Sequence, residues 1–214
     1  MSILVSDVRL PFPFSEEEAL TAARKKLRLS PESILRGCVH KQSLDLRHGD
    51  LKAICSVELQ LAGDETAFVK KRNDPHVKLR ARAIMPTPTG KEKLSAPPVI
   101  VGFGPAGIFA ALTLAKNGYR PIVLERGRAM DARDRDVKAF FDGGELDERS
   151  NIQFGEGGAG TFSDGKLYTR SNKRGNVNEI LETFVEFGAD EDILIDAHAH
   201  IGTDRLSRII KNIR

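Results

Sequence analysis

The residues best suited to chemistry in this sequence form a glycine-rich turn that follows the apolar run 99–101. The turn is Gly102-Phe103-Gly104-Pro105-Ala106-Gly107, which fits the pattern G-x-G-x-x-G. In such a turn Gly102 permits the tight bend, Gly104 lets a diphosphate approach the backbone, and Gly107 lets the next helix pack closely on the strand. Free N–H groups and the helix dipole favour an anion at a helix N-terminus, so we expect a pyrophosphate where the helix 106–117 begins.

A single carboxylate, Glu125, ends the second apolar run, 121–124. Its distance from Gly107 is typical of a carboxylate that accepts hydrogen bonds from an adenosine ribose. An acidic side chain at this position repels a 2′-phosphate, so the pattern favours FAD or NAD over NADP. The sequence therefore predicts a dinucleotide-binding βαβ unit, and a purely structural βαβ turn is the alternative.

A second glycine-rich segment, 151–170, reads NIQFGEGGAGTFSDGKLYTR. Its N–H groups can approach a flat or anionic ligand closely because few side chains stand in the way. The candidate binding residues here are Gly157, Gly158, Ala159, Gly160, Thr161, Ser163, Asp164 and Lys166. A Walker-type phosphate loop does not match, because Leu167 stands where that motif has Ser or Thr. A flexible surface loop is the alternative.

The elements that must position these candidates form a predicted α/β domain, 98–214, with a Rossmann-like FAD/NAD(P)-binding fold. The charge-dense segment 128–138 predicts a solvated helix with one apolar edge. Apolar spacing predicts a helix over 177–185, capped by Gly188, and a final helix that starts at Thr203. The apolar face of the final helix is formed by Leu206, Ile209, Ile210 and Ile213. Nothing later in the sequence can cover that face, so we expect the domain to be incomplete at its C-terminus.

The first part, 1–84, predicts a small α+β domain, followed by a linker at 85–97 that is rich in proline. Strands are expected at 3–10, 35–46 and 51–61, the last two joined by the turn 48–50. Ser15 and Glu18 form a capping box for a helix that runs to Lys26, and a second helix is expected at 64–71. A short helical turn is expected at Ser30. The order strand-helix-strand-strand-helix predicts a sheet with helices on one face.

Composition excludes several classes of protein. The net charge of +3 gives no support for nucleic-acid binding, and no apolar run is long enough for a membrane span. The N-terminus lacks the pattern of a signal peptide, so we expect a cytoplasmic protein with reduced, buried cysteines at 38 and 55. His198 and His200 would share one face of a strand and could share a metal ion. The barrel that uses this motif needs far more chain, so we expect a loop or strand end and no metal.

Three stretches resemble one group of flavoproteins: GFGPAG with the following LERG, then NIQFGEGGAGTFSDGKL, then HIGTDRL. Together with GDETA and NDPHV in the first part, they resemble the FAD-dependent oxidoreductases labelled NAD(FAD)-utilizing dehydrogenases. That group is similar to the glutathione-reductase-like flavoproteins. The resemblance covers essentially the whole chain but only the front part of the family's members.

The resemblance implies FAD as cofactor, with NAD(P)H as electron donor. It implies that the turn 102–107 holds the pyrophosphate and that Glu125 binds the ribose, with Arg126 beside it. The run 157–161, with Ser163, Asp164 and Lys166, would lie against the flavin end. The family's later strands and its substrate domain are absent from this sequence.

We therefore expect an FAD-dependent oxidoreductase, or its N-terminal portion, that acts on an unidentified small molecule. No acid or base stands out, and Asp164 and Lys166 are the candidates. Two alternatives stay open: an NAD-dependent dehydrogenase with a single Rossmann domain, and a non-catalytic module that binds a nucleotide or a partner.

Overall fold

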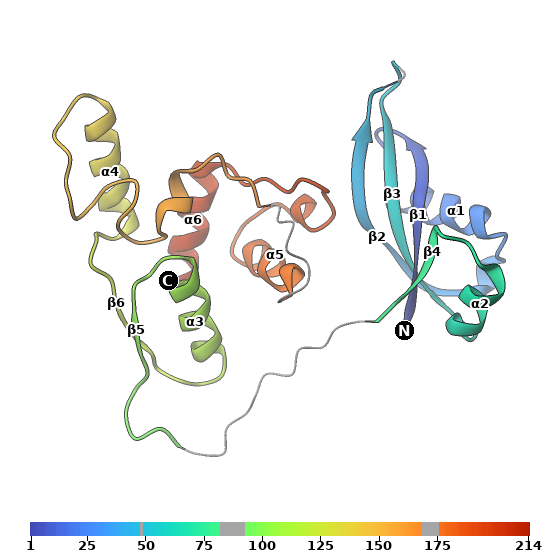
Figure 1. Ribbon diagram of the computed structural model, residues 1–214, viewed down its shortest axis with the longest axis horizontal. Helices are drawn as coiled ribbons and strands as arrows, with labels where there is room; N and C mark the ends of the chain where they lie inside the picture. The colour runs from blue at the N-terminus through green and yellow to red at the C-terminus, as the bar shows by residue number, and fades with distance from the viewer. Residues whose placement is uncertain (48, 82–92, 168–175) are drawn as a thin grey trace. The chain divides into compact units, whose positions relative to one another are not determined.

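The computed structural model describes residues 1–47, 49–81, 93–167 and 176–214 (Figure 1). The chain is a mixed α/β protein with a four-stranded antiparallel sheet and a separate parallel pair of strands. Its described residues group into two compact units. Unit 1 holds 1–81, 176–178 and 191–199, and unit 2 holds 93–167, 179–190 and 200–214. No helix in these ranges combines the length and the apolar character that crossing a membrane requires.

Unit 1 is built on the antiparallel sheet, whose strands lie in the order β2-β3-β1-β4. Its elements in chain order are β1 (Ser2–Pro11), α1 (Glu16–Leu27), a 3-10 turn (Pro31–Ser33), β2 (Ile34–Asp45), β3 (Lys52–Leu61), α2 (Glu65–Arg72) and β4 (Val77–Arg80). This order is the split β-α-β, or ferredoxin-like, arrangement. The strand β4 pairs with the start of β1 and is missing from the sequence prediction, which ended the domain's pattern at the second helix.

The two helices of unit 1 begin where the sequence predicts. The Ser15 hydroxyl accepts the N–H of Glu18, and the Glu18 carboxylate accepts the N–H of Ser15, so the predicted capping box is confirmed. The Asp64 carboxylate caps α2 by accepting the N–H groups of Thr66 and Ala67. Both helices cover one face of the sheet, because residues of each pack on one apolar core that alternate residues of β1 and β3 supply (Figure 1). The predicted turn residue His48 and the linker positions 85–92 lie outside the described residues.

The edge of β2 is covered by a segment that comes much later in the chain. Residues 191–199 begin with a 3-10 turn (Glu191–Leu194) and belong to unit 1. The Gln42 N–H donates to the Ile195 carbonyl at 2.7 Å, and the Ala197 N–H donates to the Gln42 carbonyl at 2.9 Å. The Gln42 side chain also donates to the Asp196 carboxylate. Ile195 packs on the core, so this segment is held against the sheet by its side chain and by an isolated bridge to β2 at Gln42.

Unit 2 contains the predicted β-α-β sequence. β5 (Val99–Val101) and β6 (Ile122–Leu124) pair in parallel, with Val99 opposite Ile122, and α3 (Pro105–Lys116) connects them. The remaining elements are α4 (Met130–Phe141), a 3-10 turn η2 (Ala159–Phe162), α5 (Val177–Glu186) and α6 (Thr203–Ile213). α5 packs along α3, where the rings of Phe109 and Phe184 meet edge to face at 5.7 Å.

In unit 2 the charge-dense segment forms the predicted helix, α4, with one buried edge made of Met130, Arg133 and Val137; the charged Arg133 on that edge was not expected. The apolar face of α6 packs on α4 and η2, and Leu206, Ile209 and Ile210 are buried. Sequence spacing shows a face but not what packs against it, so neither contact could be foreseen. That the domain is incomplete at its C-terminus stays a prediction. In unit 1, Cys38 is exposed on its strand, and only Cys55 is buried.

Candidate functional site

The first glycine-rich turn has the geometry that its sequence predicts. Gly102 has φ +94°, a conformation that favours glycine. A Cβ on Gly107 would collide with the Gly102 carbonyl oxygen, so a side chain there would push helix and turn apart. Gly104 is the N-cap of α3 and provides no side-chain cap, and Pro105 and Ala106 follow in the first turn, which contains no acidic residue. The N-terminus of this twelve-residue helix therefore presents backbone N–H groups and a positive dipole end.

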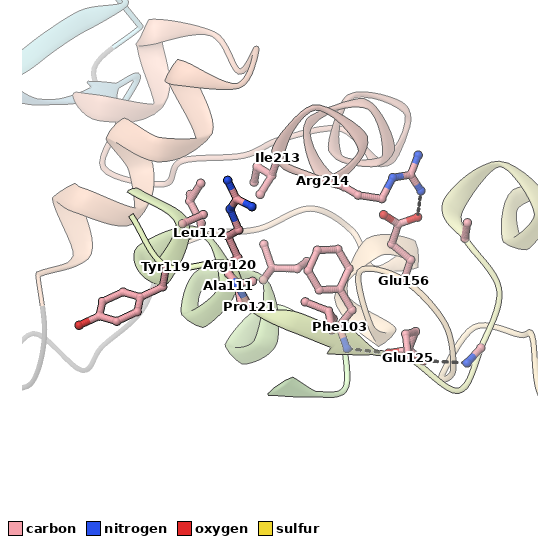
Figure 2. A pocket seen from close by; sticks show the side chains of 15 residues that line it. Phe103, Ala111, Leu112, Tyr119, Arg120, Pro121, Glu125, Glu156, Ile213 and Arg214 are labelled. Atoms are coloured by element: carbon pink, nitrogen blue, oxygen red, sulfur yellow. Dashed lines mark hydrogen bonds and ion pairs between the residues drawn. The ribbon is translucent and has the colours of Figure 1, made fainter. Parts of the chain in front are cut away.

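Glu125 closes this turn from the end of β6. Its Oε2 accepts the Phe103 N–H at 2.6 Å, and its Oε1 accepts the Gly127 N–H at 2.8 Å, as the dashed lines in Figure 2 show. The Gly102 N–H donates to the Leu124 carbonyl at 2.7 Å. The Glu125 carboxylate, which was predicted to bind a ribose, thus lies at the glycine turn, although Glu125 is far from that turn in the sequence.

The second glycine-rich segment packs directly on the first. The Gly157 N–H donates to the Phe103 carbonyl at 2.8 Å. A Cβ on Gly158 would lie 3.3 Å from the Gly104 Cα and 3.1 Å from the Pro105 ring, so the two backbones approach closely. Gly157 and Gly158 have φ +90° and +70°, and Gly158 is followed by η2, which contains Ala159, Gly160 and Thr161. The two segments that the sequence singled out therefore come together within unit 2.

The later candidates make their contacts elsewhere. The Ser163 hydroxyl donates to the Gly160 carbonyl. The backbone of Lys166 forms an isolated antiparallel β-bridge with that of His200. Asp164 and Lys166 form an exposed ion pair at 2.7 Å. The hydrogen bond from Lys166 lowers the pKa of Asp164, and the same bond raises the pKa of Lys166. Both shifts move the pKa further from neutral pH, which is unfavourable for a general acid or base. Residues 168–170 of the predicted segment lie outside the described residues.

Two grooves flank the turn and segment. The first, of about 630 Å³, lies beside the apolar side of α3 and includes Phe103, Glu125 and Glu156. Figure 2 shows Ala111 and Leu112 of α3 in this groove, together with Ile213 of α6 and the following residue, Arg214. The second, of about 590 Å³, includes Arg126, whose guanidinium stacks 4.1 Å from the centre of the Phe154 ring. Arg126 therefore faces this second groove.

Two residues of the site were missed by sequence reasoning, Arg133 and Glu156. Glu156 is only 2% exposed, and its Oε2 accepts the Met130 N–H at 2.5 Å and an Arg214 N–H at 2.6 Å. Within the described ranges, Glu156 Oε1 and the buried hydroxyl of Thr161 have no hydrogen-bond partner. Glu156 could have been found from the sequence, because it is the single charged residue in a run of glycines. Arg133 gave no signal, because it lies in a helix full of exposed charges.

His198 and His200 do not lie on one face of a strand, the arrangement in which they could share a metal ion. Residues 197–198 form a turn, so the two rings are not alternate residues of one strand. His200 Nε2 lies 2.6 Å from the Asp164 carbonyl oxygen, a contact that ties residue 200 to the second glycine-rich segment. In the part of the chain that the structure describes, no three His, Cys, Asp or Glu side chains gather as a metal site would require.

Comparison with known proteins gives a relative but no function. No protein-family model matches the chain. An uncharacterized protein of Clostridium beijerinckii is 45% identical over 192 residues. The match covers 89% of this chain and 36% of that protein, so the chain spans about a third of the relative's length.

Proposed function

We propose that unit 2 binds FAD and that the chain is the nucleotide-binding portion of a flavin-dependent oxidoreductase. The observation that carries the proposal is the Glu125 carboxylate at the glycine turn, beside the uncapped start of α3. Each carboxylate oxygen accepts one backbone N–H and has a further lone-pair site. Glu125 can therefore still accept hydrogen bonds from two ribose hydroxyls, while its charge disfavours a 2′-phosphate.

The residues around the turn fit a dinucleotide. The nearest atom to a Cβ placed on Gly104 is the Gly158 Cα at 3.9 Å, so glycine at this position leaves space that a side chain would fill. No acidic side chain in the first turn of α3 competes with an anion for its N–H groups. The orphaned hydroxyl of Thr161 and the orphaned Glu156 oxygen are buried polar atoms of the second segment that a bound ligand could satisfy.

Each group has a distinct role in this proposal. FAD, when bound, supplies hydride and electron transfer. The N–H groups of Ala106 and Gly107 would bind the diphosphate, Glu125 the ribose, and the segment 157–161 the flavin end. The Asp164–Lys166 pair is given no acid or base role, because their ion pair moves both pKa values away from neutral pH. The substrate, and NAD(P)H as electron donor, are part of the proposal for the whole protein.

The first experiment is the visible absorption spectrum of the purified chain, followed by titration with FAD, NAD and NADP. We expect one FAD per chain. Glu125→Gln should weaken FAD binding about tenfold or more, because its amide group cannot accept both backbone N–H groups and the ribose hydroxyls. Glu145→Gln, at an exposed position, is the matched control and should bind as the wild type does. A folded chain that takes up NAD but no FAD would favour the NAD-dependent dehydrogenase. A chain that takes up neither would favour a non-catalytic module.

A further inference from the structure

A buried arginine holds the second glycine-rich segment in place. The Arg133 side chain is 0% exposed, and its guanidinium carbon lies 4.9 Å from the centre of the Phe162 ring. All three guanidinium nitrogens donate hydrogen bonds to backbone carbonyls of one segment. The acceptors are the carbonyl oxygens of Asn151 (2.9 Å), Ile152 (2.8 Å), Glu156 (2.6 Å), Gly158 (2.9 Å) and, at a longer 3.4 Å, Gly155.

Only a guanidinium can make this set of bonds. It offers five N–H donors in a fixed plane, whereas a lysine offers three donors on one nitrogen. Burial lowers the pKa of Arg133, and the charges of Glu125, Asp134 and Glu156 oppose that shift. The acceptors are carbonyl groups rather than carboxylates, so the buried charge is stabilised mainly by backbone dipoles. Burying a charge is unfavourable unless it is well hydrogen-bonded, and here the whole segment supplies the bonds.

The glycines of the segment give its backbone little preference for one conformation. Gly155, Gly157 and Gly158 all have positive φ, and glycine has the largest conformational freedom of any residue. A Cβ on Gly155 would meet the Arg133 Cδ at 2.6 Å, so arginine and backbone are in close contact. The same segment packs on the first turn through Gly157 and Gly158. The position of Arg133 therefore determines how the second segment lies against the start of α3.

We propose that Arg133 is the positioning residue of the dinucleotide site. It binds the carbonyl oxygens of Glu156 and Gly158, which would repel a diphosphate, and so holds the segment against the start of α3. This inference rests on the proposed function, since the ligand is the FAD proposed above. Arg133 acts through the backbone and makes no contact with the cofactor.

The test compares Arg133→Lys and Arg133→Met with Ile209→Ala in the full chain. Ile209 is buried on α6 and serves as a control for lost stability in the same unit. Two quantities are measured: hydrogen exchange of the amides of residues 155–161 without FAD, and the FAD dissociation constant of the folded protein. Arg133→Ala with added millimolar guanidinium, against sodium chloride of equal ionic strength, is a third arm.

We expect both Arg133 variants to lose protection at 155–161 and to bind FAD about tenfold more weakly or worse. Ile209→Ala should lower the melting temperature while the FAD dissociation constant changes less than about twofold. Guanidinium should restore part of the affinity of Arg133→Ala. Arg133 variants with unchanged protection and affinity, or affinity losses no larger than that of Ile209→Ala, would overturn the inference. If the wild type binds no FAD, the proposed function fails, and the exchange data alone decide whether Arg133 fixes the segment.

Discussion

Two glycines of the first turn should respond in different ways to the addition of one methyl group. In Gly107→Ala the new Cβ collides with the carbonyl oxygen of Gly102, a backbone atom that cannot move aside as a flexible side chain would. In Gly104→Ala the nearest atom is the Gly158 Cα at 3.9 Å, an ordinary contact. The first substitution therefore tests how closely helix and strand pack, and the second tests where the diphosphate lies.

The expected changes in the free energy of unfolding differ in size. Overpacking costs about 1–3 kcal/mol, and the rigid obstacle places Gly107→Ala near 3 kcal/mol. Alanine's better helix propensity returns about 1 kcal/mol, which leaves a net loss of about 2 kcal/mol. For a chain of this size that loss lowers the melting temperature by about 4–8 °C. The φ of −79° at Gly104 suits alanine, which contributes about 0.4–1 kcal/mol, but alanine is a poorer N-cap than glycine by a similar amount. Gly104→Ala should therefore leave stability close to that of the wild type.

The assay is thermal and urea unfolding by circular dichroism, with an FAD titration of each folded variant. Gly104→Ala should keep its stability and lose FAD affinity, because the methyl group takes the space of the diphosphate. Gly63→Ala, where a Cβ meets nothing within 4 Å, is the steric control in unit 1. Wild-type stability in Gly107→Ala would refute the close packing of turn and helix. Equal losses of stability in both variants would refute the distinction between them.

Three further predictions concern caps and buried groups. Ser15→Ala removes the cap of α1 and should lower the free energy of unfolding by about 1 kcal/mol in urea; an unchanged midpoint would contradict it. Glu156→Ala leaves the buried Met130 N–H without its acceptor and should destabilise the chain by about 1–3 kcal/mol, read from thermal unfolding. Burial and the Arg80 charge lower the pKa of His40, so Arg80→Gln should raise that pKa in an NMR titration, and a downward shift would be inconsistent. Because the folded pKa of His40 lies below its unfolded value, its contribution to stability is present above the unfolded pKa and is lost as the pH falls through the folded one.

Features fixed by near neighbours in the sequence could be predicted. The capping box of Ser15, the hairpin of β2 and β3, and the β-α-β order around Gly102 all depend on residues a few positions apart. The position of Glu125 at the glycine turn could also be predicted, because neighbouring parallel strands end at the same edge of a sheet. The Rossmann-like fold and the FAD site remain proposals, since a single parallel pair of strands is compatible with both.

Features fixed by distant contacts could not be predicted. The strand β4 has only four residues, and it forms because β1 offers it a free edge. Arg133 has the same sequence environment as exposed charges on its helix, and only the carbonyls of residues 151–158 distinguish it. The Asp164–Lys166 pair could be named as a candidate acid and base, but the ion pair that shifts both pKa values depends on geometry. A buried or paired polar side chain can be identified only from the atoms that contact it in the folded chain.

The late segment that covers the edge of β2 has a consequence for the synthesis of the protein. At about 5–20 residues per second, residues 191–199 leave the ribosome several seconds after the four strands of unit 1. During that interval Gln42 and its strand present an open edge, which is the kind of surface that recruits other chains. A fragment that ends after β4 keeps this edge open permanently. We therefore expect such a fragment to self-associate on expression more than the chain that contains residues 191–199, whose backbone bonds to this edge at Gln42.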